Sequence, residues 1–353
     1  MPQKNDFSKK LISWYRENKR DLPWRNTNDP YKIWISEIML QQTTVSAVIP
    51  YYERWIKSFP DVHLLARVSL QKILKQWQGL GYYRRARNIQ KAAKIIVSDY
   101  DGSVPSDSES LRKLPGFGPY TTGAVLSIAF NRRYPIVDAN VRRVIMRQLA
   151  LEGHADTSKD KEIINFLDDV MPQKNMSCFN QGLMELGALI CRTDSPRCIA
   201  CPVKNTCAAY KKGVQEIIPE SKKRIIKKID AVIAVIENKG LFFIQKRTDK
   251  GLLADLWEFP GGKIEDGETP RKTLIRELKE EVGAEVISVK QMMKLKHFYT
   301  QFEVHLHVYV CKVNLPLKKD ASHRWVGLKK ISSYPMPSGS SKIVDFILKR
   351  EKA

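Results

Sequence analysis

Glu37 is the first residue whose surroundings suggest chemistry. It is the only charged side chain in the stretch IWISEIMLQQTTV at 33–45, and Ile33 and Trp34 lie one helical turn before it. Burial among such neighbours would disfavour the charged carboxylate and raise its pKa. A carboxyl group that keeps its proton near neutral pH is what a general acid requires. The ordinary alternative, a glutamate on a solvated helix face, stays open from the sequence.

A glycine-containing turn is the second candidate. Residues 114–124 read LPGFGPYTTGA, in which Gly116 and Gly118 permit a tight turn and a close approach of the backbone. A turn that follows one helix and opens another points free backbone N–H groups outward and forms an anion site. In a basic chain the expected anion is a DNA phosphate.

Asp138 follows this turn and directly precedes a helical run, in YPIVDANVRRVIMRQL. An aspartate at that place is a good N-cap, because its side chain can accept a hydrogen bond from a free N–H of the first turn. Capping would also fix the position of the carboxylate, so a structural role and a catalytic role are compatible.

Four cysteines lie within 17 residues and suggest a metal or cluster site. Their spacing is C-x6-C-x2-C-x5-C. Zinc usually takes two close pairs of ligands, and only one close pair is present here. One compact loop of thiolates suits a 4Fe–4S cluster better, with zinc as the rival. The predicted ligands are Cys191, Cys198, Cys201 and Cys207.

A long motif that contains several glutamates and glycines lies in the C-terminal part of the chain. Residues 257–284 read WEFPGGKIEDGETPRKTLIRELKEEVGA and match the Nudix box almost position for position. Glu277, Glu280 and Glu281 fall at helical spacing, so that they could share one Mg²⁺. The favoured interpretation is that the box only shapes the fold, its Glu and Arg residues being tied up in ion pairs. Hydrolysis of nucleoside diphosphate derivatives is the alternative.

The whole chain carries a large positive charge. Its 353 residues include 60 Lys and Arg against 38 Asp and Glu, a net charge of +22. Residues 1–210 and 211–353 each carry +11, so the excess is not a detachable tail. Such a surplus indicates a polyanionic partner. No apolar stretch reaches the length of a membrane span and MPQKNDFSKK lacks a signal core, so we expect no membrane association and a cytoplasmic location.

Hydrophobic periodicity divides the chain into two kinds of structure. Residues 7–210 show helical spacing throughout. From about 230, AVIAVI and LFFIQK flank a turn as in a hairpin, 302–311 alternate with period two, and 270–282 form one helical stretch. We therefore predict a multidomain protein: an all-α domain at 1–212 that includes the cysteine loop at 191–207, a linker at 213–229, and an α/β domain at 230–353.

These motifs together resemble the MutY family of adenine DNA glycosylases, within the endonuclease III superfamily. The resemblance rests on WISEIMLQQT, DLPWR at 21–25, GLGYYRRAR at 79–87, the LPGFGPYTTGA hairpin, the cysteine spacing and the Nudix box, in the family's order. It implies a helix–hairpin–helix glycosylase domain with a 4Fe–4S loop, followed by a Nudix-like lesion-recognition domain. The implied activity is base excision repair: removal of adenine mispaired with 8-oxoguanine or guanine in double-stranded DNA.

The resemblance also implies catalytic roles. Glu37 would protonate adenine and later activate water, Asp138 would stabilise the oxocarbenium ion or its covalent adduct, and Asn140 would help to hold the deoxyribose. Bifunctional relatives carry a lysine nucleophile where this sequence has Tyr120. This difference predicts a monofunctional glycosylase without an efficient lyase step.

Further positions are matched to the family's binding residues. They are the wedge candidates Gln42, Leu80 and Tyr82, the phosphate-binding Gly116 and Gly118, the adenine-pocket candidates Arg20, Trp24 and Gln181, and the lesion-recognition residues Tyr299 and Thr300. The family's usual Phe-Ser-His loop is changed here, since Gln301 replaces the histidine.

Several alternatives to this function remain open. One is a lyase of the endonuclease III kind, which Tyr120 and the C-terminal domain oppose. Another is a bifunctional protein whose Nudix box also hydrolyses nucleoside diphosphate derivatives. The last is a non-enzymatic, cluster-bearing DNA-binding protein, which leaves Glu37 and Asp138 without roles. For the leading function we expect a monomer.

Overall fold

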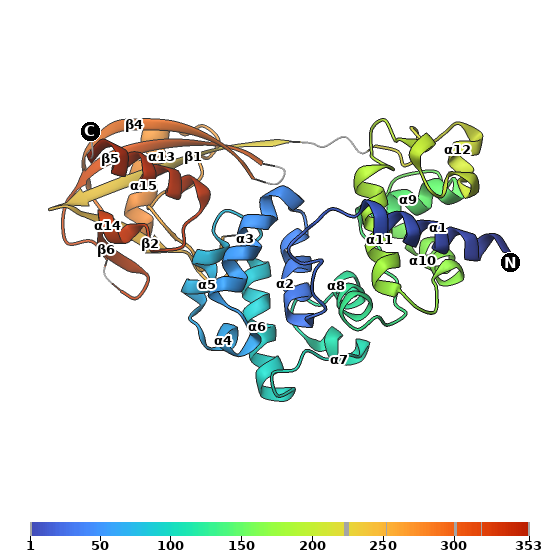
Figure 1. The fold of residues 1–353 in the computed structure, drawn as a ribbon. Helices are drawn as coiled ribbons and strands as arrows, with labels where there is room; N and C mark the ends of the chain where they lie inside the picture. Colours follow the sequence, from blue (N-terminus) through green and yellow to red (C-terminus); the bar gives the residue numbers. More distant parts are fainter. Residues whose placement is uncertain (1, 222–225, 252, 300–301, 319, 352–353) are drawn as a thin grey trace. The chain divides into compact units, whose positions relative to one another are not determined.

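The computed structural model describes residues 2–221, 226–251, 253–299, 302–318 and 320–351 (Figure 1). The chain forms two compact units. The first joins residues 1–67 to 88–222, and the second joins residues 68–87 to 223–353. The linear boundaries at 212 and 230 stay predictions.

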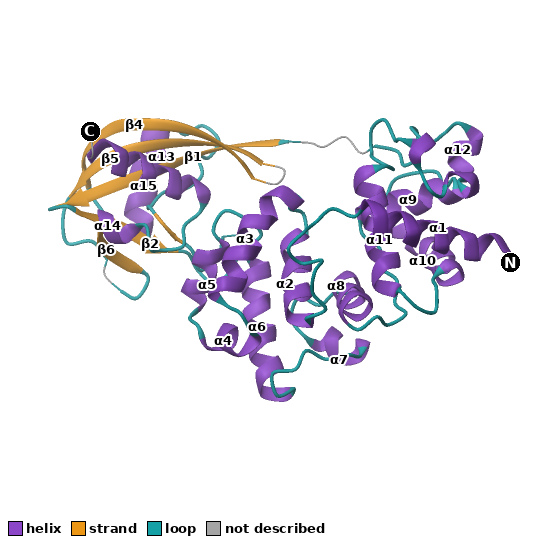
Figure 2. Ribbon diagram, viewed as in Figure 1, coloured by secondary structure: helices purple, strands orange, loops and turns teal. Residues whose placement is uncertain are grey.

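The first unit is helical, as the periodicity predicts (Figure 2). Its α-helices are α1 (Pro2–Asn18), α2 (Pro30–Leu40), α3 (Val45–Ser58), α4 (Val62–Arg67), α6 (Arg84–Asp99, whose first turn belongs to the second unit), α7 (Ser108–Lys113), α8 (Pro119–Ala124), α9 (Ala139–Leu149), α10 (Asp160–Val170), α11 (Met176–Leu189) and α12 (Ala208–Lys212). The π-helix η1 (Val125–Ala129) continues α8, and the short 3-10 helices are η2 (Thr157–Lys159), η3 (Cys198–Ala200) and η4 (Lys204–Thr206).

Aspartate caps set the starts of the helices that carry the site. Asp29 accepts hydrogen bonds from the backbone N–H groups of Tyr31 and Lys32, and Pro30 occupies the first position of α2. Asp138 caps α9 in the same way, as expected from its position in the sequence. A hydrophobic core then holds α1, α9, α10 and α11 together through buried residues that include Leu11, Ile145, Leu167 and Leu183. This packing fixes the start of α9, where Asp138 lies, relative to α11.

The second unit contains a mixed sheet. Its strands are β1 (Lys227–Asn238), β2 (Leu241–Lys246), β3 (Trp257–Glu258), β4 (Val286–Tyr299), β5 (Phe302–Val313) and β6 (His323–Gly327), and its helices are α5 (Leu70–Trp77), α13 (Pro270–Val282), α14 (Leu328–Ile331) and α15 (Ser338–Glu351). The strand order is β3-β2-β1-β5-β4, and β6 pairs with β2. β1 runs parallel to β5, whereas β1–β2 and β4–β5 are antiparallel. The predicted hairpin, the strand at 302–311 and the helix at 270–282 are confirmed.

Helices cover both faces of this sheet. Val232, Ala234 and Ile236 of β1 pack with α13, whereas Val235 lies in the core formed with α14 and α15. This alternation explains why AVIAVI is apolar throughout, since a strand buried on both faces has no polar side to show. In the part of the chain that the structure describes, no helix is long and apolar enough to cross a membrane.

Candidate active site

Glu37 lies on α2 and is buried, with only 4% of its surface exposed. This excludes the solvated helix face that the sequence left open. The Tyr120 hydroxyl donates a 2.5 Å hydrogen bond to Glu37 Oε2. Burial raises the pKa of Glu37 to about 7, although the bond from Tyr120 acts in the opposite direction. The group can therefore hold or release a proton near neutral pH.

Tyr120 stands in the first turn of α8, directly after the glycine hairpin. Its hydroxyl also lies 3.7 Å from the sulfur of Met184. Burial, together with the negative charges of Glu37 and Asp138, raises the pKa of Tyr120 well above its usual value. The phenol consequently keeps its proton and acts as a fixed donor to Glu37.

Asp138 combines its capping role with exposure to the same site. Its Oδ1 accepts a 2.6 Å hydrogen bond from the backbone N–H of Val141, and its Oδ2 accepts a 3.1 Å bond from the Asn140 side chain. Burial raises the pKa of Asp138, and these two bonds lower it. The carboxylate is thus anchored by the start of α9 and cannot swing away.

One cavity of about 730 Å³ joins these groups. Glu37, Tyr120, Asp138 and Asn140 line it, although they are far apart in the sequence. The three predicted adenine-pocket residues line it as well: Arg20, Trp24 and Gln181. Trp24 is buried and meets Tyr52 edge to face, which gives the cavity a rigid aromatic wall.

Glu185 is a residue of this cavity that sequence reasoning missed. It is buried in α11, and its two carboxylate oxygens accept hydrogen bonds of 2.6–2.9 Å from the side chains of Arg20 and Arg25. Despite the cost of burial, these partners lower its pKa to about 2. A signal was available, because Glu185 is the only charged residue of the apolar helix MSCFNQGLMELGAL.

Arg143 connects the start of α9, where Asp138 and Asn140 lie, with the cysteine loop. It donates to Asn140 Oδ1 at 3.0 Å, to the carbonyl of Gly187 at 2.8 Å and to the carbonyl of Cys191 at 2.8 Å. A Cβ atom at Gly187 would lie 2.6 Å from the Cβ of Asn140, so only glycine lets α11 approach α9 this closely. The position of Asn140 therefore depends on both the helix pair and the loop.

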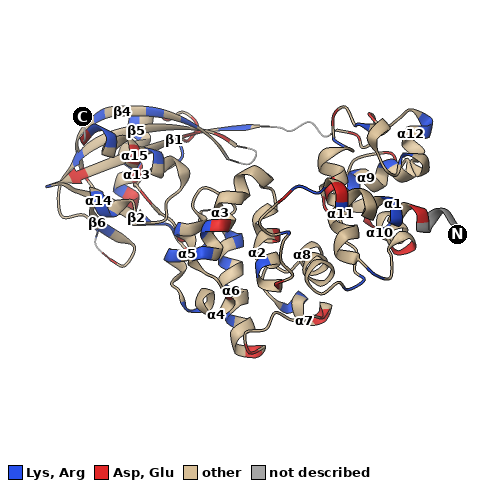
Figure 3. Cartoon of the chain, viewed as in Figure 1, with Lys and Arg blue, Asp and Glu red and all other residues tan. Residues whose placement is uncertain are grey.

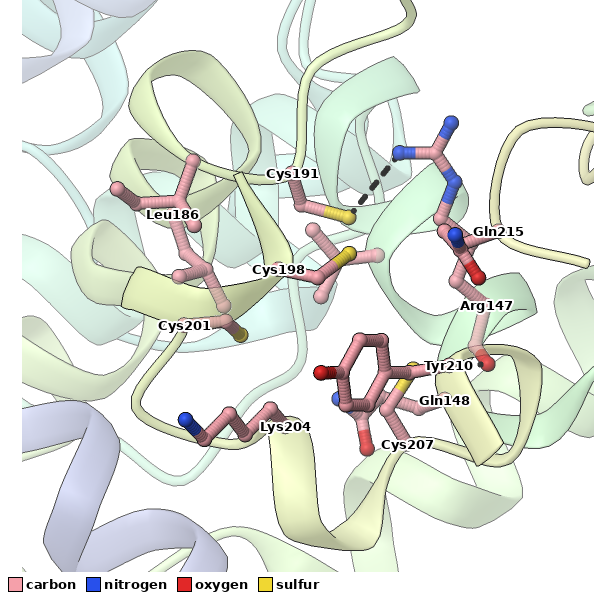
Figure 4. Close-up of a pocket in the computed structure, with 12 residues that line it drawn as sticks. Arg147, Gln148, Leu186, Cys191, Cys198, Cys201, Lys204, Cys207, Tyr210 and Gln215 are labelled. Carbon is pink, nitrogen blue, oxygen red and sulfur yellow. Dashed lines mark hydrogen bonds between the residues drawn. The ribbon is translucent and has the colours of Figure 1, made fainter. Parts of the chain in front are cut away.

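The four predicted cysteine ligands line one pocket (Figure 4). Arg147 is almost fully buried beside it, with one N–H 3.3 Å from the sulfur of Cys191 and others bonded to the carbonyls of Arg192, Thr193 and Ile218. Within the described ranges, however, no three His, Cys, Asp or Glu side chains are already arranged as ligands of one metal ion. The four sulfur donors therefore line one pocket, but among the described residues they are not close enough together to bind one metal ion.

Comparison with known proteins identifies the family. The chain is 36% identical over 348 residues to the adenine DNA glycosylase of Buchnera aphidicola subsp. Schizaphis graminum, an alignment that covers 96% of this chain and 98% of that protein. The chain belongs to the adenine DNA glycosylase family. The mouse adenine DNA glycosylase is a more distant relative, 33% identical over 359 residues, with 86% of this chain and 70% of the relative covered. The resemblance to the MutY family is confirmed.

Domain models and solved structures agree with this assignment. Residues 35–172 match the HhH-GPD superfamily base excision DNA repair protein model, and residues 231–346 match a NUDIX domain. A thermostable thymine-DNA glycosylase superposes with a TM-score of 0.54 at 30% identity, covering 60% of this chain and 98% of that one. A non-covalent endonuclease III–DNA complex gives 0.51 at 27% identity with the same coverage. The family's two-part architecture is therefore present here.

Other predicted residues of this family member lie outside the cavity. Gln42 is exposed, with a left-handed backbone (φ 55°), just after α2. Gly116 also has a positive φ, of 89°, and Gly118 caps α8. Leu80 is buried and Tyr82 is partly exposed in the second unit.

One of the predicted lesion-recognition residues lies within the described part of the chain. Tyr299 is the last residue of β4. Thr300 and Gln301 lie outside the described residues, so their predicted role stays a prediction.

Three carboxylates of the Nudix box form ion pairs with one arginine. Arg276 donates to both oxygens of Glu268, at 2.8 and 2.9 Å, and also bonds Glu277 at 2.9 Å and Glu280 at 3.1 Å. Glu281 instead accepts from the Gln245 side chain at 2.7 Å and from the backbone N–H of Gly261 at 3.0 Å. These bonds tie the box helix α13 to the loop before it and to the sheet.

Replacing Glu37 with glutamine should change the pH dependence of stability. The pKa of Glu37 rises on folding from 4.5 to about 7, so the native state binds more protons than the unfolded chain in that window. Wild-type protein therefore loses stability as the pH rises through it, by at most about 3 kcal/mol. Glutamine does not titrate. The melting temperature of Glu37→Gln should therefore increase relative to that of the wild type as the pH is raised from about 5 to about 8. A pH-independent difference, equal to that of the exposed control Glu53→Gln, would contradict the assignment.

Proposed function

We propose that this chain hydrolyses the N-glycosidic bond of adenine mispaired with 8-oxoguanine or guanine in double-stranded DNA, as a step of base excision repair. The observation that carries this proposal is the cavity in which Glu37, protonatable near neutral pH, lies with the anchored Asp138. Relatives throughout the family are named adenine DNA glycosylases, which supports adenine as the base. Such a base must leave the duplex stack to enter a cavity of this kind.

Glu37 serves as the acid in the first step. Adenine is a poor leaving group as an anion, so protonation at N7 allows it to depart as a neutral base. With a pKa of about 7, a substantial fraction of Glu37 carries the required proton at neutral pH. Tyr120 fixes the orientation of the carboxyl group and, by donating to it, keeps the conjugate base accessible.

Asp138 stabilises the charge that develops as the bond breaks. When the base leaves with the bonding electron pair, the sugar becomes an oxocarbenium ion, and a fixed carboxylate beside it lowers the energy of that state. Asn140 donates to Asp138 and lines the same cavity, where it can also contact the deoxyribose. Ionised Glu37 then takes a proton from water, whose hydroxide adds to C1′, and the starting protonation state is restored.

The remaining lining residues suit an adenine ring. Trp24 offers an aromatic wall. Gln181 has both a donor and an acceptor in its amide, and the Nε2 of that amide is bonded to Ser177 Oγ at 2.9 Å. The cluster of Glu185, Arg20 and Arg25 gives the cavity a rigid polar wall.

Single-turnover release of adenine from an A:8-oxoguanine duplex tests the mechanism. Glu37→Gln and Asp138→Asn should each slow release by about 100-fold or more, because the first removes the acid and the second removes the charge that stabilises the cation. Asparagine is also a good N-cap, so Asp138→Asn leaves α9 capped. The exposed Glu53→Gln should keep the wild-type rate. Wild-type activity in both Glu37→Gln and Asp138→Asn would contradict the mechanism.

The chain is further proposed to be monofunctional. A lyase step needs an amine that forms a Schiff base with the opened sugar. The described lining of the cavity contains arginines but no lysine, and Tyr120 donates to Glu37 at the position where lyases of the superfamily carry the amine.

Borohydride trapping examines this point directly. With the abasic product or an A:8-oxoguanine duplex, wild-type protein should form little covalent complex, because no lysine lies in the cavity lining. A Tyr120→Lys variant, read on a denaturing gel beside wild type, is the positive control for the geometry. Strong trapping by the wild-type chain would contradict monofunctionality.

DNA binding is proposed to use both units of a monomeric chain. Lys and Arg occur on helices of the first unit and on strands and helices of the second (Figure 3). Residues 62–98 contain eight basic residues and no acidic one. The hairpin glycines 116 and 118 would hold a phosphate, Gln42 and Tyr82 would occupy the gap left by the extruded base, and Tyr299 with Thr300 would read the opposite base. A location with the cell's DNA follows from this substrate.

A 4Fe–4S cluster held by the four cysteines is also proposed. The donor set fits: four sulfurs line one pocket, and the buried cation of Arg147 lies 3.3 Å from one of them, which suits a negatively charged thiolate cluster. When bound, the cluster would cross-link the loop at 191–207 and so support Arg143 and Asn140. Its chemistry enters no step of base removal.

Metal analysis of anaerobically purified protein distinguishes the cluster from zinc. About four iron and four sulfide per chain are expected, with Cys198→Ser reducing both and lowering the melting temperature. The core cysteine variant Cys311→Ser should keep the iron. One zinc per chain without sulfide would overturn the cluster.

For the Nudix box we propose a structural role. Arg276 alone engages Glu268, Glu277 and Glu280, and lowers the pKa of Glu268 to about 2. Carboxylates neutralised in this way stabilise the loop and helix instead of a cation. Neither Mg²⁺ binding nor hydrolysis of nucleoside diphosphate derivatives is therefore part of the proposed function.

A further inference from the structure

The segment 68–87 belongs to the second unit, although residues 88–222 of the first unit separate it in the chain from the rest of the second unit. It consists of α5, a tight turn and the first residues of α6. The turn is conformationally demanding, because Gly79, Gly81 and Tyr82 all have positive φ, of 103°, 72° and 47°. A tyrosine in the left-handed region is strained and persists only where surrounding contacts hold it.

Some of these contacts come from the segment itself. Trp77 donates its indole N–H to the carbonyl of Gly81 at 3.0 Å. Arg85 donates to the carbonyls of Leu80 and Gly81, and its guanidinium lies over the rings of Trp77 and Tyr82. The turn is therefore held at its inner side by the two helices that flank it.

The other contacts come from the Nudix-like fold, and Gln78 makes the most direct of them. Its amide nitrogen donates to Ser341 Oγ at 2.9 Å, and its amide oxygen accepts from the backbone N–H of Met336 at 3.2 Å. Lys75 donates to the same oxygen at 2.9 Å and to the carbonyl of Tyr334 at 3.3 Å. Both ends of the Gln78 amide are thus used to join the start of the turn to the 334–341 region.

Additional bonds fix the two flanks of the segment. The Tyr83 hydroxyl accepts from Gly79 N–H at 3.3 Å and lies 3.5 Å from the carbonyl of Met336. Gln71 donates to the carbonyl of Asp255 at 3.0 Å and accepts from the Trp257 indole at 2.9 Å. The helix before the turn and the residue after it are therefore attached to the same fold, so the turn has little freedom to relax.

The geometry points to a second task for the Nudix-like fold: it holds the turn that carries Tyr82 in its strained conformation, with Gln78 as the positioning residue. This inference rests on the proposed function, in which Tyr82 fills the gap left by adenine. The fold would then assist extrusion of the base on one side of the pair, independently of any contact with the opposite base. Gln78 itself touches no reacting atom.

The test uses the full-length chain and reads extrusion separately from chemistry. A duplex carries 2-aminopurine next to the adenine of an A:8-oxoguanine pair, so that fluorescence rises when the stack opens. Gln78→Ala and Ser341→Ala should each reduce both this rise at saturating protein and single-turnover adenine release, by about three- to tenfold, the loss expected for one hydrogen bond. The double variant should be no slower than Gln78→Ala alone, because both changes break the same contact.

Matched variants separate positioning from loss of structure. Ser341→Thr keeps the hydroxyl and should restore the wild-type signal, whereas Ser332→Ala, whose hydroxyl bonds only within its own turn in the described structure, should have no effect. Melting temperature and affinity for undamaged duplex should stay close to wild type, which a merely structural defect would not allow.

Failure of the positioning role can be distinguished from failure of the proposed function. Gln78→Ala and Ser341→Ala variants with wild-type fluorescence and rate, or strictly additive effects, would overturn the positioning role. If Gln78→Ala does not fold, Ser341→Ala tests the same contact from the other side. If wild-type protein opens the stack but releases no adenine, the proposed function fails while the fluorescence comparison still decides the inference.

Discussion

A carboxyl group buried on an apolar helix is the constraint around which the site is built. Without partners, burial would favour the neutral form of Glu37 more strongly, and a carboxyl group that holds its proton too tightly is a poor acid. The hydrogen bond from Tyr120 opposes this effect and leaves the pKa at about 7. The helix hairpin that brings Tyr120 to α2 therefore helps to set the pKa of Glu37.

Glu37 and Glu185 show how strongly the hydrogen-bond partner determines the pKa of a buried carboxyl group. Glu37 is the only acidic residue of α2, Glu185 is the only charged residue of α11, and both are buried in the lining of one cavity. Glu185 meets two guanidinium groups and has a pKa of about 2, whereas Glu37 meets a neutral phenol and has a pKa of about 7. One is thereby fixed as a permanent anion that orders the cavity wall, and the other becomes available for acid–base chemistry.

In the second unit too, the partners of the carboxyl groups determine their role, although the motif has the residues of a catalytic one. The box carries the expected glutamates, yet Arg276 binds three carboxylates of the motif and Glu281 bonds to Gln245 and the Gly261 backbone. The unit also incorporates residues 68–87, which belong in chain order to the helical part. In our proposal, Gln78 lets this Nudix-like fold hold the turn that carries Tyr82.

The sequence by itself determined the elements and the family. Hydrophobic periodicity predicted the helical part and the hairpin, and it placed α13 at 270–282, because side-chain patterns of period 3.6 and 2 are local properties. Local sequence context also indicated Glu37, Asp138 and the four cysteines, and the resemblance to the family indicated Tyr120. Only the tertiary structure decided what these residues meet: Tyr120 at Glu37, Arg20 and Arg25 at Glu185, and Ser341 at Gln78. Such partners lie far apart in the chain, and pKa values and hydrogen bonds depend on distances that a single sequence does not record.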